Sequence, residues 1–175
     1  ANIMALDMKI VPPGWEKSVC MDILQNIRVE YEGFLNTGIF GLARVFKVLS
    51  ENGYEDEVYR LLTRTGDNSF ANMWDRFDVT TLWETLPTNS ESGSTYSGSM
   101  SHPMQAGFDS WFYSGIAGIK PLEEGPGFSK IEFKPYMTRQ MEYASASYES
   151  KAGTVVSAWE RADDSLSWTI RIPAN

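Results

Sequence analysis

The sequence has little of what disulfide scaffolds, metal centres and nucleic-acid binders require. Cys20 is the only cysteine and His102 the only histidine, so no internal disulfide can form and a zinc or transition-metal site is disfavoured. Lysine and arginine total 15 against 23 acidic residues, which gives a net charge of −8. Binding to nucleic acid or to an anionic membrane needs clustered basic residues, and the sequence holds no such cluster. We therefore expect no cofactor, no nucleic-acid partner and no membrane partner, whereas neutral ligands such as sugars suit this composition.

Long apolar runs are lacking as well. No window approaches the roughly 18 apolar residues of a membrane span, and the start of the chain lacks the basic-then-apolar pattern of a signal peptide. Hydrophobic residues nevertheless make up 42% of the chain, a value typical of globular domains. The sequence enters a helical pattern at once in "ANIMALDMK" and ends in a strand-like pattern at "IPAN". From this we expect a part of a longer protein.

The first two thirds of the chain predict paired helices. Apolar residues recur at helical spacing in "EKSVCMDILQNIRVE", "LARVFKVLSENG" and "YEDEVYRLLTRTG". Only Asn52-Gly53, a helix-ending signal, separates the last two segments, so residues 40–66 predict an αα-hairpin. "NSFANMWDRF" predicts one more short helix with Ser69 as its N-cap.

A long polar loop and a change of period follow. Residues 87–103 are almost free of large aliphatic side chains and predict a surface loop. A helix is expected next, with one apolar face made of Met104, Phe108, Trp111, Phe112 and Ile116. After residue 120 the pattern alternates, in "KIEFKP" and in a hairpin "TVVSAWERADDSLSWTIRIP" that turns near Asp163-Asp164, and we expect about four strands in all.

One carboxylate stands out in the stretch "DVTTLWETL", where Glu84 follows a tryptophan directly. Alternate side chains of an extended chain share a face, so Glu84 and Trp83 are expected to point in opposite directions. A carboxylate within reach of a water can act as a general base. The alternatives are a solvated surface charge or a structural ion pair with a cation such as Arg76 or Lys120.

Polar candidates converge on the same region. Asn36 and Thr37 in "LNTG" begin the predicted hairpin, and His102 ends the long loop. The proline after His102 favours an extended backbone, which can aim the imidazole into a cleft. A helix cap or an exposed loop position is an equally good interpretation of His102.

Two groups of aromatic residues have different expectations. Trp111 and Phe112 fit an apolar stripe, which favours a place in the core. Trp74 and Trp83 lie off such stripes and are better candidates for a ligand platform, since an indole offers an apolar face and a polar edge.

Four segments carry a family resemblance. "GFLNTGIFG", "VLSENGYEDEVYRLLTRT", "TTLWE" and "SHPMQAGFDSWFYSGIAGI" occur in this order and at fitting separations. Together they resemble the bacterial α-L-rhamnosidases of glycoside hydrolase family 78 over about residues 1–135. The strands that follow are similar to the C-terminal β-sandwich of that family. One departure is "TLPTNSESGSTYS", which replaces the arginine and tryptophan that usually follow the glutamate.

The resemblance implies a fold and two domains. We expect a mainly α fold, with helical hairpins forming part of an (α/α)6 catalytic barrel over residues 1–125. Residues 126–175 are expected to start a smaller antiparallel β-sandwich.

The resemblance also implies a chemistry. It implies a cleft for a terminal L-rhamnose, hydrolysis with inversion, Glu84 as the general base and His102 as a sugar contact. Pocket-lining aromatic residues of the family match Trp83 and Trp111, and Asn36 and Thr37 lie in a matching segment. The general acid of the family lies upstream of all these residues, so the isolated chain is expected to be inactive. Exposed apolar faces of a partial barrel also predict self-association.

Two rival functions stay open at this point. One is a non-catalytic carbohydrate-binding or scaffold module in which Glu84 is a structural ion-pair partner. The other is a different (α/α)6 glycosidase, such as an α-L-fucosidase relative.

Overall fold

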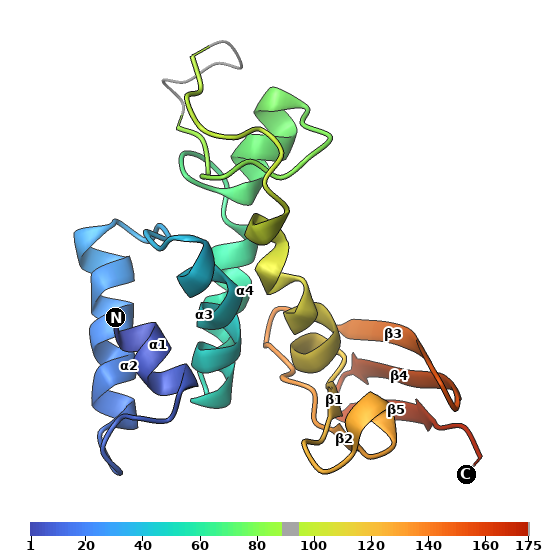
Figure 1. Cartoon of the computed structure of the whole chain (residues 1–175). Coiled ribbons are helices and arrows are strands. Elements are labelled where there is room, and N and C mark those ends of the chain that lie inside the picture. The colour runs from blue at the N-terminus through green and yellow to red at the C-terminus, as the bar shows by residue number, and fades with distance from the viewer. Residues whose placement is uncertain (89–94, 175) are drawn as a thin grey trace. The chain divides into compact units, whose positions relative to one another are not determined.

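The computed structural model describes residues 1–88 and 95–174, and these form two compact units, Ala1–Phe108 and Asp109–Asn175. The first unit is helical and the second consists mainly of strands (Figure 1). The sequence predicts family domains over residues 1–125 and 126–175. The compact units do not test these bounds, so the division stays a prediction.

The first unit is built from short helices. Their bounds are α1 (Asn2–Asp7), α2 (Glu16–Gln25), η1 (Asn26–Glu30), α3 (Ile39–Glu51), α4 (Glu55–Thr63), η2 (Asn72–Arg76) and η3 (Pro103–Phe108). α1 packs against both α2 and α3, and α3 packs against α4 and η3. In the part of the chain that the structure describes, each helix is too short or too polar to cross a lipid bilayer.

The αα-hairpin predicted over residues 40–66 is confirmed as α3 and α4. The apolar stripe of α3 is buried, as are Val58 and Leu61 of α4, so the two helices share one core. The turn closes when the Tyr54 N–H donates to the Leu49 carbonyl at 2.9 Å. Gly53 adopts φ +83, a left-handed conformation that glycine reaches without strain and that explains the predicted stop signal.

The predicted N-cap at Ser69 is also confirmed. Its Oγ accepts a hydrogen bond from the Asn72 N–H at 3.0 Å and donates to the Gly66 carbonyl at 2.6 Å. Ser69 is 1% exposed, so the cap satisfies backbone groups that water cannot reach. It starts the segment that ends in η2.

The single helix expected from Met104 to Ile116 is wrong. The structure has the 3₁₀ segment η3 and then the π-type turn η4 (Phe112–Ile116). Met104 and Phe112 are exposed, whereas Phe108 and Trp111 are buried, so the side chains do not share one buried face.

The second unit contains two small antiparallel sheets. β1 (Ile119–Pro121) pairs with β2 (Ile131–Phe133), beside the short 3₁₀ turn η5 (Pro126–Phe128). β3 (Tyr143–Ser150), β4 (Gly153–Ala162) and β5 (Ser165–Arg171) form the other sheet in that order. The predicted strand at "KIEFKP" and the hairpin that turns at Asp163-Asp164 are confirmed. The described residues form five strands where the sequence predicts about four, because alternating apolar residues mark neither β1 nor β3.

The core of the second unit lies between these sheets. Ala117, Ile119 and Val155 are buried, and Phe128, Ile131, Phe133 and Ala146 pack against them. The Ser157 hydroxyl donates to the Ala117 carbonyl at 2.6 Å, which ties β4 to the segment before β1. In contrast, the alternating apolar residues of β5 stay substantially exposed, at 50% for Leu166 and 43% for Ile170.

Candidate active site

The segment that carries Glu84 is held by hydrogen bonds to residues 99–102. The His102 N–H donates to the Leu82 carbonyl at 2.8 Å, and the Glu84 N–H donates to the Ser99 carbonyl at 2.9 Å. The two segments thus pair in opposite directions. This pairing fixes the backbone of Glu84 even though the intervening residues 89–94 lie outside the described structure.

Aromatic packing fixes the residue before Glu84. Trp83 is 5% exposed, and its ring packs on Phe77 at 5.2 Å and on Tyr96 at 4.4 Å between centroids. The Tyr96 hydroxyl accepts a hydrogen bond from the Thr85 N–H at 2.9 Å and lies 3.0 Å from the Thr85 hydroxyl. Glu84 is therefore flanked on both sides by residues that Tyr96 contacts.

A third anchor lies at Pro87, which is fully buried. Its carbonyl accepts hydrogen bonds from the Asn72 side-chain amide at 2.8 Å and from the Asn68 N–H at 3.2 Å. The Ser69 cap fixes the turn that carries Asn68 and Asn72. Residues that follow α4 therefore hold the end of the Glu84 segment.

The two carboxylate oxygens of Glu84 have different surroundings. Oε2 accepts a hydrogen bond from the Ser99 N–H at 3.0 Å. Among residues 1–88 and 95–174, Oε1 has no hydrogen-bond partner and no cation pairs with the carboxylate. Glu84 is solvent-exposed. One oxygen thus orients the group and the other is available to a ligand or a water.

A pocket of about 150 Å³ brings Glu84 together with two other predicted site residues, Asn36 and Thr37. Asn68, Thr85 and Gln105 add polar groups to its wall. The apolar part of the wall is made of Leu35, Leu42 and Leu86. Its lining therefore combines one carboxylate, several amides and hydroxyls, and an aliphatic side, as a small polar ligand with an apolar substituent requires.

The loop that carries Asn36 and Thr37 is clamped by Arg64. The Arg64 guanidinium lies 3.5 Å from the centroid of the Phe34 ring and donates from Nη1 to the Glu32 carbonyl at 3.2 Å. At the other end of the loop, a Cβ at Gly41 would lie 1.8 Å from the Thr37 hydroxyl oxygen. Glycine at that position is what lets Thr37 sit against the first turn of α3.

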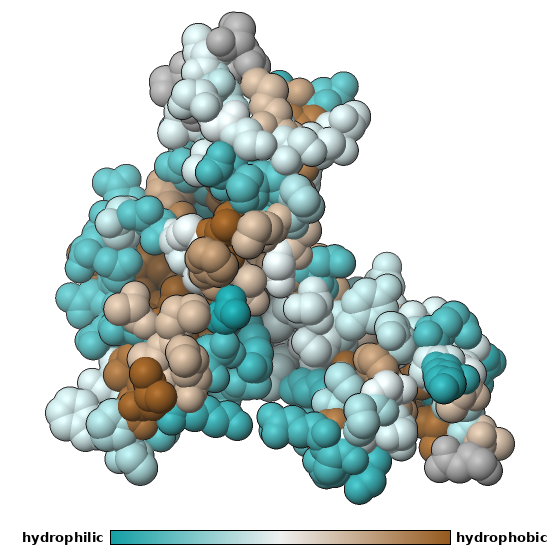
Figure 2. All heavy atoms as spheres, in the orientation of Figure 1, coloured by the Kyte–Doolittle hydropathy of each residue, from teal (hydrophilic) through white to brown (hydrophobic). Residues whose placement is uncertain are grey.

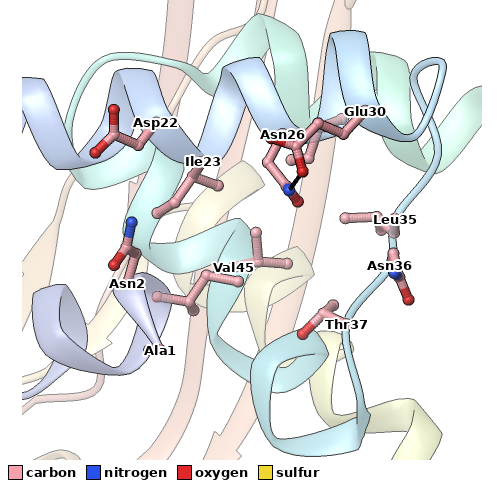
Figure 3. Close-up of a pocket in the computed structure, with 12 residues that line it drawn as sticks. Ala1, Asn2, Asp22, Ile23, Asn26, Glu30, Leu35, Asn36, Thr37 and Val45 are labelled. Carbon is pink, nitrogen blue, oxygen red and sulfur yellow. Dashed lines mark hydrogen bonds between the residues drawn. The ribbon is translucent and has the colours of Figure 1, made fainter.

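A larger cavity of about 430 Å³ continues on the other side of this loop (Figure 3). It shares Leu35, Asn36 and Thr37 with the Glu84 pocket. In Figure 3, Asn26 and Glu30 of the helix across the top are hydrogen-bonded to each other and face the loop. Within the described residues, no three His, Cys, Asp or Glu side chains gather as a metal site needs.

His102 is placed next to the Glu84 segment through its backbone. Its Nε2 is buried without a hydrogen-bond partner in the described residues, and burying a polar atom unpaired is costly. The ring is not part of the pocket wall described above. A contact of His102 with a sugar stays a prediction.

The two tryptophans of the predicted site lie in hydrophobic cores. Trp83 packs between Phe77 and Tyr96 rather than in the pocket wall, so it supports the backbone of Glu84. Trp111 belongs to the second unit, is 2% exposed and packs against Gly115. A direct contact of either indole with substrate stays a prediction.

Sequence patterns did not identify Gln105, Asn68 and Thr85 as parts of the pocket. Gln105 stood within an expected amphipathic helix, where a polar residue usually faces solvent. Asn68 preceded a predicted helix cap. Its φ of +51 is the left-handed conformation that asparagine tolerates better than most residues, and this preference is the signal that the sequence offered.

Comparison with known proteins agrees with this architecture. The family model of the bacterial alpha-L-rhamnosidase six-hairpin glycosidase domain matches residues 1–116. The chain belongs to this family. The model of the bacterial alpha-L-rhamnosidase C-terminal domain matches residues 118–175. The helical hairpins of the first unit are thus part of an (α/α)6 barrel, as the resemblance implied.

Individual relatives cover the chain along its length. An alpha-L-rhamnosidase of Formosa agariphila is 29% identical over 185 residues, which span 100% of this chain and 18% of the relative. One from Alteromonas sp. is 29% identical over 178 residues, spanning 100% of this chain and 19% of that protein. The chain therefore corresponds to about a fifth of the length of the relatives it matches.

Solved structures give the same result for the fold. The alpha-L-rhamnosidase from Dictyoglumus thermophilum superimposes with a TM-score of 0.88 at 30% identity, covering 99% of this chain and 19% of that one. The Streptomyces avermitilis alpha-L-rhamnosidase complexed with L-rhamnose superimposes with a TM-score of 0.85 at 25% identity, covering 98% and 17%.

Proposed function

We propose that this chain supplies the general base and part of the sugar-binding wall of an inverting α-L-rhamnosidase. The observation that carries the proposal is the asymmetry of the Glu84 carboxylate. Oε2 is held by the Ser99 N–H, and Oε1 has no partner in the described structure, in a pocket shared with Asn36 and Thr37.

The proposed reaction is a single displacement at the anomeric carbon. Glu84 takes a proton from a water as the oxygen of that water bonds to the anomeric carbon. The glycosidic C–O bond breaks on the opposite face as an acid protonates the leaving oxygen. Inverting glycosidases place the two carboxyl groups about 6.5–9.5 Å apart to admit the water. The resemblance assigns the acid to a segment outside residues 1–175, so this chain contributes the base alone.

The pocket wall supports a deoxy sugar as the ligand. L-Rhamnose carries a methyl group where many hexoses carry a hydroxymethyl group, and Leu35, Leu42 and Leu86 offer an aliphatic surface to it. Asn36 and Thr37 offer hydrogen bonds to ring hydroxyls. His102, whose buried Nε2 lacks a partner in the described residues, is the next candidate for a sugar contact.

The test uses the complete gene product that carries this chain. Glu84→Gln keeps the shape of the side chain but removes the basic oxygen, so we expect kcat on p-nitrophenyl α-L-rhamnoside to fall by about 10²–10⁴-fold. Glu124→Gln, at an exposed carboxylate of the second unit, is the matched control and should leave kcat unchanged. Near-normal turnover of the Glu84 variant would refute the base assignment.

The isolated 175-residue chain provides a second test. It lacks the proposed acid and should show no turnover of aryl α-L-rhamnosides. Glu84-dependent turnover by this chain alone would contradict the proposal. A non-catalytic carbohydrate-binding module would bind L-rhamnose with no turnover in the complete gene product. An α-L-fucosidase relative would prefer the fucoside in a panel of aryl glycosides.

A further inference from the structure

Gln105 is a buried polar residue that the proposed reaction does not use. It is 5% exposed and belongs to η3, yet it lines the pocket that holds Glu84. Its backbone N–H donates to the His102 carbonyl at 2.9 Å. In the part of the chain that the structure describes, no hydrogen bond involves its side-chain amide.

The packing of η3 on α3 fixes the backbone that carries this side chain. η3 packs on α3 so closely that a Cβ at Gly107 would lie 2.5 Å from the Ala43 Cβ. The Phe108 ring meets the rings of Phe46 at 5.8 Å and Phe70 at 4.7 Å. Gln105 therefore lies on a tightly packed backbone, which reduces the conformational entropy lost on ligand binding.

The amide of Gln105 has the donor and acceptor that a pair of neighbouring sugar hydroxyls needs. Its NH₂ group can donate to one hydroxyl oxygen while its carbonyl accepts from the next. The amide lies on the wall of an open pocket, so a bound polyol can replace water as its hydrogen-bond partner. The charge of the site also fits a neutral ligand, because Glu84 is the only charged residue among the described residues that line this pocket.

We propose that Gln105 is a specificity-determining residue of the sugar site, where it recognises adjacent ring hydroxyls of the deoxy sugar. This inference rests on the proposed function. It goes further by naming the residue that distinguishes a polyol from a ligand lacking those hydroxyls. A site built to hydrogen-bond a hydroxyl discriminates strongly against analogues without it, because its own polar group is then left unpaired.

The experiment measures L-rhamnose binding to the complete gene product by calorimetry, together with kcat and KM on p-nitrophenyl α-L-rhamnoside. Gln105→Met keeps the length of the side chain and removes the amide. We expect about tenfold weaker binding of L-rhamnose and a matching rise in KM, with kcat changed less. Gln25→Met, at an exposed glutamine of α2, is the matched control and should bind as the wild type does.

The outcomes separate this inference from the proposed function. If Gln105→Met binds L-rhamnose as tightly as the wild type, the inference is overturned while the function stands. If the wild type neither binds nor hydrolyses the rhamnoside, both are overturned. If Glu84→Gln remains active but Gln105→Met binds weakly, the base assignment fails and the role of Gln105 stands. Should Gln105→Met fail to fold, Gln105→Asn retains an amide but retracts it by one methylene. Weak binding by that variant supports the inference, and unchanged binding overturns it.

Discussion

Glu84 and Ser99 are joined by two reciprocal hydrogen bonds. The Glu84 N–H donates to the Ser99 carbonyl at 2.9 Å, and the Ser99 N–H donates to Glu84 Oε2 at 3.0 Å. The carboxylate is thus oriented by the backbone of the segment that its own backbone binds.

Removal of the Tyr96 hydroxyl should impair the site without unpacking Trp83. In Tyr96→Phe the ring still contacts Trp83, but the Thr85 N–H loses its acceptor. Losing one such hydrogen bond costs about 1–2 kcal/mol, so we expect kcat/KM to fall about 5–30-fold. Steady-state kinetics of the complete gene product measure this, with Tyr59→Phe on α4 as the control. Unchanged kinetics would show that the hydrogen bond between Thr85 and Tyr96 does not influence Glu84.

Thr37 and Gly41 should be energetically coupled. Gly41→Ala places a methyl group against the Thr37 hydroxyl, so it should destabilise the protein by about 1–3 kcal/mol despite the better helix propensity of alanine. In a Thr37→Ala background the oxygen is gone, and the same change should become neutral or stabilising. Chemical denaturation of the four proteins in this double-mutant cycle gives the coupling energy. Additive effects would contradict the close contact.

The stability of the helical unit should depend on the ionisation of Glu57. Burial raises the pKa of Glu57, but hydrogen bonds from Arg60 and Arg28 and their charges outweigh it, so the pKa is lowered from its ordinary 4.5. Because its pKa is lower in the folded state, the ionised Glu57 stabilises the fold at pH values above its unfolded pKa. This contribution is lost as the pH falls through the folded pKa.

Glu57→Gln tests that pH dependence. At neutral pH it should lower the free energy of unfolding by about 1–2 kcal/mol, because Arg28 and Arg60 are each about half exposed and water replaces part of the interaction. The difference in the free energy of unfolding between the variant and the wild type should narrow as the pH falls below 4.5. Denaturation curves at several pH values measure it, and a difference that does not vary with pH would argue against the ion-pair origin.

The isolated chain should self-associate. Large apolar side chains of the helical unit are exposed, among them Ile10 at 68%, Trp15 at 62% and Phe40 at 64%, and Figure 2 shows apolar atoms on its surface. Exposed apolar groups of this kind favour association. Light scattering over a concentration series should show mass increasing with concentration. Trp15→Gln with Phe40→Gln should reduce it, and a monodisperse wild-type monomer would contradict the prediction.

Local rules predicted much of this fold. Helical spacing located α3 and α4, the Ser69 cap marked the start of the segment that ends in η2, and Asp163-Asp164 marked the turn of the β4–β5 hairpin. β3 escaped prediction because "YASASYES" alternates small and polar residues rather than apolar ones. The expected helix after His102 failed because η3 packs tightly on α3 through Gly107, which is a tertiary contact that periodicity does not encode.

The candidate site was predictable in part. Glu84, Asn36 and Thr37 were named from local chemistry, and they line one pocket. Trp83 and Glu84 were expected to point in opposite directions, and Trp83 is buried whereas Glu84 is exposed. Gln105 could not be found from the sequence, because its importance depends on which helix face lies against α3 and which lies in the pocket.

The hydrogen bonds that Asn68 and Asn72 donate to the Pro87 carbonyl determine which substitutions near Glu84 the chain can tolerate. These hydrogen bonds hold Pro87, and the Tyr96 ring packs on Trp83, so the segment that carries Glu84 is held both before and after residues 88–95. We therefore expect the position of the Glu84 carboxylate to tolerate substitutions within residues 88–95.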